Sequence, residues 1–343
     1  MRLWAFLLLL VGLLALFFID LAWGSIAIPL QDIAKLLLKG HHENQVWQQI
    51  IYKIRLPKAL TAVLAGSALA VSGLQMQTLF RNPLAGPSVL GITAGASLGV
   101  ALVVLGSAQW KLGFSSYLQG LSGSGLVVVA ACLGAAFTFV LIMMVAYRIS
   151  DHIVLLLIGL MVGNITSALV GVAQYFSRPE QIQDYLIWTF GSLGGVLGNQ
   201  LWVFAGVVLI GFCLILVVLK DLNLLLLGET YARSMGVGVV KVRIFVIAST
   251  ALLTGVVTAF CGPIAFVGVA VPHIARVLFS SADHRLLLPS TAILGAILLL
   301  FCDIFTHLPG SSIALPINAV TSVIGSVIVL MVVLKSRDLR RSF

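Results

Sequence analysis

The sequence predicts an all-α protein that crosses a membrane about ten times. Of its 343 residues, 60% are hydrophobic and only 9% are charged, a balance that soluble folds do not reach. The apolar residues form continuous blocks of roughly 20 residues, the length that a helix needs to cross a bilayer. These blocks lack the ten-residue alternation of barrel strands, which favours helices.

The predicted spans follow one another closely along the chain. In order, they lie near residues 3–21, 59–79, 89–106, 125–147, 153–175, 201–219, 244–262, 264–279, 288–307 and 315–334. The first block is also compatible with a signal peptide that begins at Arg2, but it is long for such a segment and Trp23 suits an interfacial anchor. The four cysteines are interpreted as small buried hydrophobes without disulfide or zinc spacing: Cys132, Cys213, Cys261 and Cys302.

Three stretches indicate broken or short helices. Cys261-Gly262-Pro263 ends one apolar run, Val271-Pro272 interrupts the next, and the segment from Trp188 to Gly198 is apolar but too short to cross. Non-helical backbone at membrane depth persists only where protein or a water-filled cavity covers it. This pattern favours a transporter over a passive scaffold.

Small residues recur at four-residue spacing, which lets helix backbones approach closely inside lipid. The glycines concerned are Gly91, Gly95 and Gly99, then Gly159 with Gly163, and Gly191 with Gly195. Packing within one bundle is the preferred interpretation, and a subunit interface or pore lining is the alternative.

The distribution of Lys and Arg predicts that both termini are cytoplasmic. With this orientation thirteen of the 20 basic residues lie inside and seven outside. Five of the seven lie in the loop between the first two spans: Lys35, Lys39, Lys53, Arg55 and Lys58. They are either a basic rim for an acidic partner or charges that keep a long loop solvated. The net charge of +9 follows from cytoplasmic anchoring and requires no nucleic acid.

Few carboxylates lie at membrane depth, where they usually mark ion coupling. The candidates are Asp20, and Asp303 one helical turn from His307. A hydrogen bond between Asp303 and His307 is the preferred interpretation, and a proton relay is the alternative. The chain has no GxxxxGK[ST], HExxH or GxSxG motif, so it carries neither a phosphate loop nor a recognisable catalytic centre. A transporter of this kind needs an energy source that docks onto it.

The polar segment from Lys220 to Arg243 interrupts the apolar blocks and is the natural docking site. It predicts two short helices joined at Gly228, the second of which ends at Gly236 as a C-cap. Apolar anchors are expected from Leu225, Leu226, Tyr231 and Met235, and Glu229 and Arg233 form an i,i+4 pair on the solvated side. An amphipathic hairpin lying on lipid is the alternative.

Several blocks together resemble the FecCD-type permeases of ATP-binding-cassette (ABC) importers, which carry ferric siderophores, haem or cobalamin. The first group is Arg55-Leu56-Pro57-Lys58, Ala65 to Gly73, Gln75 to Gln77, Leu79 to Ala85 and Leu90 to Ala96. The second is Gly228-Glu229 with Tyr231 to Gly236, and the third is Gly262 to Ile264, Phe266 to Gly268, Val271 to Arg276, Asp283 to Arg285 and Leu288-Pro289. The resemblance covers nearly the whole chain.

The resemblance implies a type II ABC importer permease fold, with residues 1–343 as a single transmembrane domain and 220–243 as its coupling-helix segment. It implies a homodimer in the bacterial inner membrane, two ATP-binding subunits beneath it, and a periplasmic or lipid-anchored substrate-binding protein outside. ATP and Mg would bind the partner subunits. This chain would hold no cofactor or metal and would not itself be an enzyme.

The resemblance also assigns residues to roles. Docking of the binding protein falls to Arg55, Lys58 and His307. Coupling to the ATPase falls to Leu225, Leu226, Gly228, Glu229, Tyr231, Ala232, Arg233, Met235 and Gly236. The candidates for the translocation path, each of which competes with a packing role, are Ser72, Gln75, Gln77, Gly91, Gly95, Asn164, Thr166 and Ser167.

Two positions depart from the family pattern. Many relatives have an acidic residue before the Leu-Pro that opens the last span, where this chain has Ala314-Leu315-Pro316, and Asn318 replaces a glycine. The second docking contact would involve His307, near the end of the ninth predicted span. This contact is ionic only if His307 is protonated. Two other functions remain open: an ion-coupled secondary carrier that uses Asp303 and His307, and a membrane-embedded enzyme, for which no catalytic cluster is found beyond those two residues.

Overall fold

The computed structural model describes residues 2–24, 26, 28–40, 44–106, 123–149, 151–307 and 314–335. Within these ranges the regular structure is helical apart from one isolated bridge between His307 and Ala314. Four basic residues that contribute to the predicted orientation lie outside the described residues: Lys111, Arg337, Arg340 and Arg341.

Each predicted apolar block contains a helix. The long ones are α1 (Arg2–Ala22), α4 (Leu56–Phe80), α7 (Gly123–Arg148), α8 (His152–Tyr175), α10 (Asn199–Val217), α13 (Val239–Cys261) and α15 (His284–Thr306). The others are α5 (Ile92–Val104), α14 (Val267–Phe279) and α16 (Ile317–Lys335). In the described part of the chain, seven stretches are long and apolar enough to cross a membrane. The predicted all-α, multi-span architecture is confirmed.

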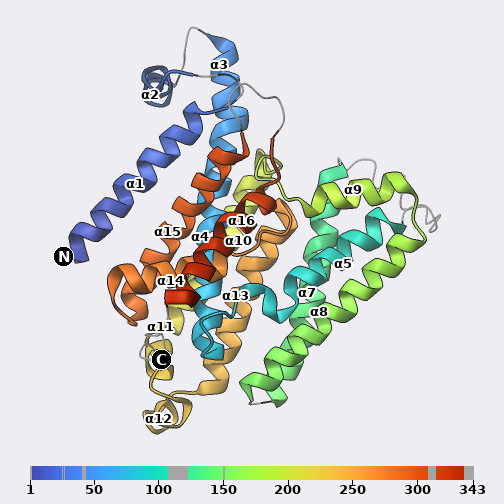
Figure 1. Ribbon diagram of the computed structural model, residues 1–343, viewed down its shortest axis with the longest axis vertical. Helices are drawn as coiled ribbons and strands as arrows, with labels where there is room; N and C mark the ends of the chain where they lie inside the picture. The colour runs from blue at the N-terminus through green and yellow to red at the C-terminus, as the bar shows by residue number, and fades with distance from the viewer. Residues whose placement is uncertain are drawn as a thin grey trace.

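Short helices lie between these elements. They are α2 (Leu30–Lys39), α3 (Gln45–Ile50), the π-helical turn η1 (Ile51–Arg55), the 3-10 turn η2 (Pro87–Leu90), α9 (Pro179–Thr189), α11 (Leu219–Leu225) and α12 (Glu229–Ser234). Figure 1 shows α2 and α3 at one end of the bundle and α11 and α12 at the other. We call these the α3 end and the α12 end.

Two groups of helices flank a central pair. Helices α1, α14 and α15 pack around α4, while α5, α7 and α8 form a second group on the other side of α13 (Figure 1). Helices α4 and α13 are the central elements, because 78% and 72% of their apolar windows are buried, against 11% for α1. The outward-facing helices present their apolar side chains to the surrounding lipid, as a membrane fold requires.

Glycine pairs allow the helices around α4 to cross at close range. A Cβ atom on Gly66 would lie 2.2 Å from the carbonyl oxygen of Gly295 in α15, and one on Gly73 would lie 1.7 Å from that of Gly268 in α14. Neither crossing has room for a methyl group. The packing of α4 therefore depends on these glycines.

The predicted interruption at Val271-Pro272 is wrong, because Pro272 lies inside α14. Proline has no N–H to donate to the carbonyl four residues earlier, which here is that of Gly268. The same carbonyl packs against the backbone of Gly73. The close contact with α4 thus covers the place where the helix lacks a hydrogen bond.

The predicted break after Cys261 is confirmed. Helix α13 ends there, and Gly262 adopts a φ of +76° that disfavours a side chain. The backbone N–H of Ser192 donates to the carbonyl of Cys261 (2.8 Å), so the two non-helical segments are joined to each other. The short apolar segment from Trp188 to Gly198 consists of the end of α9 and the turns that follow it.

Asn318 at the start of α16 completes this junction. Its side chain accepts a hydrogen bond from the N–H of Ala265 (3.2 Å) and donates to the carbonyl of Thr189 (3.4 Å), and its backbone N–H donates to Phe190 (3.2 Å). The amide side chain therefore satisfies backbone groups of both broken segments. This gives the departure from the family glycine a structural reason.

The predicted glycine stripes pack within the chain. A Cβ atom on Gly95 or Gly99 would lie 2.0 Å from Thr138 or from the carbonyl of Ala130, both in α7, and one on Gly159 would lie 2.2 Å from Val89. Gly163 has no atom within 4 Å of such a Cβ.

The prediction that Cys132 and Cys213 are buried is wrong, because both are exposed on the outward faces of α7 and α10, where lipid accommodates an apolar thiol.

A Gly73→Val substitution tests the α4–α14 crossing. We expect the forced separation of the two backbones to destabilise the protein by about 3 kcal/mol. Gly206→Val in α10 is the matched control, because no atom lies within 4 Å of the added Cβ. The measurement is the thermal unfolding midpoint in detergent, and equal midpoints for the two variants would contradict the role of the crossing.

Candidate functional site

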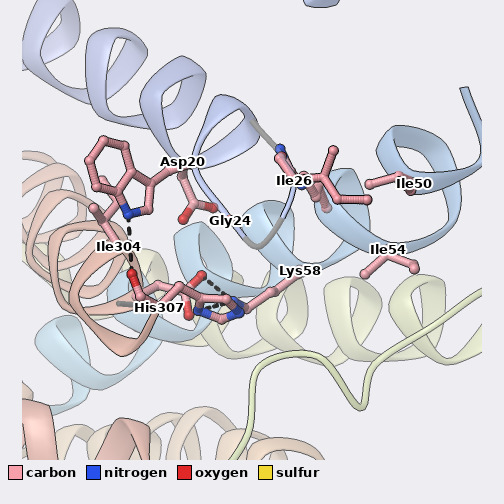
Figure 2. A pocket seen from close by; sticks show the side chains of 11 residues that line it. Asp20, Gly24, Ile26, Ile50, Ile54, Lys58, Ile304 and His307 are labelled. Carbon is pink, nitrogen blue, oxygen red and sulfur yellow. Dashed lines mark hydrogen bonds and ion pairs between the residues drawn. The ribbon is translucent and has the colours of Figure 1, made fainter. Parts of the chain in front are cut away.

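Five ionisable side chains gather at the α3 end of the bundle. Asp20 comes from the end of α1 and Arg55 from the last position of η1. Lys58 lies at the start of α4, Asp303 near the end of α15, and His307 directly after α15. They line a cavity of about 170 Å³ together with Trp23, Ile50, Ile54 and Ile304 (Figure 2). Residues that are far apart in the sequence thus form one polar site at the edge of an apolar bundle.

Arg55 ties the end of α1 to the start of α4. Its guanidinium group donates to the carbonyls of Leu21 (2.7 Å), Ala22 (3.0 Å) and Ile26. The last carbonyls of a helix have no partner within the helix, so Arg55 caps α1. Its side chain is buried. The structure therefore places this predicted docking residue inside the chain, where its hydrogen bonds are already in use.

Lys58 pairs with a buried carboxylate. Its ammonium group lies 2.9 Å from Oδ2 of Asp303, whose side chain is 2% exposed, and Asp20 lines the same cavity as Asp303. Two adjacent carboxyl groups repel each other when both are charged, and a neighbouring cation reduces that repulsion. The Lys58 side chain retains 17% exposure, and it lines the cavity together with the more buried Arg55.

His307 faces Lys58, and the predicted hydrogen bond between the side chains of His307 and Asp303 is not formed. The Thr306 hydroxyl donates to the carbonyl of Asp303 (2.6 Å) and lies 2.7 Å from Nδ1 of His307. The Lys58 ammonium lies 3.4 Å from Nδ1 and 3.5 Å from Nε2 of the same ring, so the two side chains face each other. Burial and the charge of Lys58 lower the pKa of His307 below its usual value.

Three of the predicted path residues lie in the interior between α4 and its neighbours. Ser72 accepts a hydrogen bond from Thr254 of α13 (3.4 Å), and the amide of Gln75 bonds to Ser249 and Thr250 of the same helix (3.0 and 3.1 Å). The amide of Gln77 donates to the carbonyl of Val269 (3.1 Å) and accepts from Arg276, both in α14. In this structure their polar groups hold helices together.

The other predicted path residues lie on α5 and α8. Thr166 and Gly95 line a groove of about 550 Å³ between α5, α7 and α8, whereas Asn164 and Ser167 are exposed on α8. Gly91 adopts a φ of +71° at the start of α5, close to the carbonyl of Gly159. Asn164 and Ser167 are therefore the predicted path residues with exposed polar side chains.

The segment at the α12 end forms two short helices joined through Gly228, as predicted. Gly228 adopts a φ of +115° between α11 and α12. After α12, Gly236 has a φ of +84° and the N–H of Val237 donates to the carbonyl of Ala232 (3.0 Å). This is the Schellman pattern at a helix C-terminus. The predicted glycine cap is confirmed.

The predicted contact residues of this segment divide between two faces. Leu225 and Ala232 are buried against the rest of the chain. Tyr231 and Met235 are 50% and 59% exposed, and Leu226 is half-buried. Arg233 pairs with Glu229 at 3.5 Å and is mostly exposed. An exposed surface of mixed apolar and basic character therefore protrudes at the α12 end.

Sequence reasoning did not find the residues that attach this segment to the bundle. Arg81 donates to the carbonyl of Leu225 (3.1 Å), and the Asn223 amide bonds to Asp283 and to His284 at the start of α15 (2.7 and 2.8 Å). Arg243, which is 2% exposed, pairs with Glu229 (3.2 Å). Each contact joins residues at least 14 positions apart, so no local pattern marks it.

Comparisons with known proteins place the chain in a family. Residues 12–335 match the FecCD transport family, and the chain belongs to that family. The vitamin B12 import system permease protein BtuC of Citrobacter koseri is 37% identical over 84% of this chain and 83% of its own length. The protein of the same name from Salmonella schwarzengrund is 38% identical over 87% of this chain and 86% of its own length.

Solved structures agree with this assignment. A protein described as a metal-chelate type ABC transporter in an inward-facing conformation matches 95% of this chain and 97% of its own, with a TM-score of 0.82 and 28% identity. PsaBC from Streptococcus pneumoniae, in complex with Fab, shares the fold with a TM-score of 0.50 and 16% identity over 90% of this chain and 97% of its own. Among the described residues, no three His, Cys, Asp or Glu side chains form a metal-binding group.

Asp303→Asn tests the ion pair at the α3 end. The substitution leaves the ammonium of Lys58 in a mostly buried site without its nearest anion. We expect a loss of stability of about 2 kcal/mol, less than for a fully buried pair because Lys58 keeps some exposure. Adding Lys58→Met should recover most of this loss in a double-mutant cycle of thermal unfolding. Additive losses in the two single variants would show that the two groups do not interact.

Proposed function

We propose that this chain is the membrane-spanning permease of an ATP-driven importer, without an ATPase site of its own. The observation that carries the proposal is the protruding α11–α12 segment, which exposes Tyr231, Met235 and Arg233 at one end of a bundle that has no nucleotide-binding motif. An exposed apolar and charged surface outside the lipid region is suited to bind another protein.

The proposed cargo is a bulky metal chelate: cobalamin, haem or a ferric siderophore. The names of the BtuC relatives support cobalamin, and the family assignment supports the wider class. Weak, unspecific contacts suit a passage for a large molecule, because tight binding along the way would slow its release. The exposed Asn164 and Ser167 on α8 are the best candidates for such contacts, since Ser72, Gln75 and Gln77 are engaged in packing.

The proposed assembly is a homodimer with two ATP-binding subunits at the α12 end, where ATP and Mg bind to the partner. A substrate-binding protein, periplasmic or lipid-anchored, docks at the α3 end. In this arrangement both termini face the cytoplasm of a bacterium, the chain lies in its inner membrane, and residues 1–343 form one permease domain. ATP binding would close the motor subunits, and α11 and α12 would convert this closure into alternating access by rigid-body movement.

Docking of the binding protein is proposed to use Lys58 and His307. Both line the cavity at the α3 end, and the Lys58 side chain is more exposed than that of Arg55. An acidic side chain that enters this cavity would meet the Lys58 ammonium, which is paired with Asp303, and the His307 ring, which becomes a cation on protonation. The buried guanidinium of Arg55 would support this surface by holding α1 in place.

The alternative is a carrier driven by ions through Asp303 and His307. The adjacent carboxyls of Asp20 and Asp303 favour it, since intramembrane carboxylates often carry protons. The contact with Lys58 argues against it, because a salt-bridged carboxylate binds a proton less readily. ATP-driven uptake that continues after the proton gradient is collapsed, and after Asp303→Asn, would exclude the carrier.

Glu229→Arg tests the proposed coupling surface. The change places like charges beside Arg233 and Arg243, so we expect α12 to lose its position and ATP-driven uptake to fall by about tenfold or more while the chain still inserts.

Loss of Arg233 should lower ATP hydrolysis and uptake together, because this exposed side chain would contact the motor subunit. Uptake of radiolabelled cyanocobalamin into proteoliposomes is the measurement, and normal uptake in both variants would remove the coupling role.

Native mass spectrometry of the complex co-expressed with its ATPase tests the assembly. Two copies of this chain with two ATPases are expected, and scrambling residues 228–236 should release the ATPases while the permease dimer remains. A lone chain that ignores the ATPase would contradict the proposal and favour the carrier.

The docking proposal predicts a pH dependence. Burial and the charge of Lys58 lower the pKa of His307 below the usual histidine value of about 6.5, so the ring is neutral at pH 7. The ring gains its charge only as the pH falls below 6.5. Affinity for the binding protein should then rise about two- to fivefold between pH 7.5 and pH 5.5, the range expected for one partly exposed ion pair.

Two variants isolate this effect from titration of the binding protein. His307→Gln should lose the part of the pH dependence that comes from this chain, and His307→Arg should bind more tightly at pH 7.5. Binding measured by surface plasmon resonance with the same binding protein gives the comparison. An unchanged pH dependence in His307→Gln would show that this residue takes no part in docking.

A further inference from the structure

The segment at the α12 end is attached to two different parts of the bundle. Helix α11 is held by Arg81 at the end of α4 and, through Asn223, by the start of α15. His284 extends this attachment, because its ring lies 2.8 Å from Asn223 and 2.8 Å from Thr78 of α4. Helix α11 therefore belongs mechanically to the group around α4.

Helix α12 is attached elsewhere. Its first residue, Glu229, pairs with Arg243 in α13 (3.2 Å), and the guanidinium of Arg243 also donates to the carbonyl of Ile149 (2.9 Å). Ile149 directly follows α7, and Asp151 two residues later caps α8 by accepting from the N–H of Ile153 (2.7 Å). A single planar cation thus joins α12 to the connection between α7 and α8.

The joint between α11 and α12 allows them to move relative to each other. Gly228 adopts a φ of +115°, a conformation that residues with a side chain rarely accept, and it forms the link with Leu226 and Leu227. Its φ and ψ can change at lower cost than those of any other residue type. Movement of α12 therefore need not carry α11 with it.

We infer that Arg243 is the positioning residue through which movement of α12 reaches α8. The inference rests on the proposed function and deepens it by naming the route from the motor to the helix that bears Asn164 and Ser167. The burial of Arg243, at 2% exposure, keeps water from competing for its hydrogen bonds. Its planar fork holds Glu229 and the Ile149 carbonyl at the same time, which a point charge does less well.

Lys241 provides the matched control for Arg243. Lys241 lies on the same helix two residues before Arg243, carries the same charge and is exposed. Lys241→Gln removes a cation from this region without removing the link. Any effect of Arg243→Gln that Lys241→Gln lacks is therefore due to the link and not to the net charge.

The experiment uses the complete complex in proteoliposomes and follows α8 directly. Asn164→Cys provides an exposed label site, with the exposed Cys132 and Cys213 replaced by serine and the buried Cys261 and Cys302 retained. Its labelling rate by a membrane-impermeant maleimide is measured without nucleotide and with ATP, and ATP hydrolysis is measured on the same preparation. We expect ATP to change the labelling rate by about fivefold or more in the parent protein.

In Arg243→Gln, ATP hydrolysis should stay within about twofold of the parent while the ATP-dependent change in labelling is lost. Lys241→Gln should behave as the parent, and Arg243→Lys should restore part of the change. A full labelling change in Arg243→Gln, or an equal loss in Lys241→Gln, would overturn the inference. An unchanged labelling rate in a parent complex that still hydrolyses ATP and takes up cargo would overturn the inference alone, whereas a parent without ATP-driven uptake would overturn the proposed function.

A second variant serves if Arg243→Gln lowers the yield of the complex. Glu229→Gln removes the same ion pair from its more exposed end and leaves Arg243 bonded to Ile149. It should also lose the ATP-dependent change in labelling. Retention of the change in Glu229→Gln would overturn the inference in the same way.

Discussion

The structure depends on one constraint: inside a bilayer, backbone polar groups must find partners within the protein. The continuous helices meet it by themselves, but the breaks between Thr189 and Asn199 and after Cys261 do not. The two breaks meet it together, because Ser192 donates to Cys261 and the side chain of Asn318 bonds to Ala265 and Thr189. The freed carbonyl of Gly268 is covered by the backbone of α4 instead. Broken helices can therefore exist at this depth only in the positions that the fold gives them relative to one another.

The same constraint applies to charged side chains, which also need partners within the protein. Several buried charged groups have partners from other helices, such as Asp303 with Lys58 near the α3 end and Arg243 with Glu229 near the α12 end. Desolvated charges without partners would cost several kcal/mol each, so these contacts fix which helices meet. They also leave the middle of the bundle to uncharged groups, as in the amides of Gln75 and Gln77. A permease built in this way has its charged contacts at its two ends, where partner proteins would bind.

The helices could be predicted because a span is a local property of the sequence. About 20 apolar residues in a row define a helix whatever surrounds them, and glycines such as Gly228 and Gly236 mark its ends. The contacts that define the site could not be predicted in this way. Lys58 and Asp303 are separated by most of the chain, whereas the sequence predicts that Asp303 bonds to His307, its neighbour one helical turn away. The sequence also predicts a break at Pro272, although the helix continues there and Gly73 packs against the carbonyl of Gly268. Arg55 and Leu225 match a family pattern, but a pattern does not show which way a side chain faces.

Hydrogen bonds and ion pairs hold both ends of the bundle, but the two ends differ in which helices they join. At the α3 end, Arg55 and Lys58 join α1, α4 and α15 into one unit, so a protein that docks there meets a firm surface. At the α12 end, α11 is joined to that unit while α12 is joined to the connection between α7 and α8, and a glycine separates them. A firm docking surface and a divided coupling segment are what alternating access requires, because one group of helices must move while the other keeps its place.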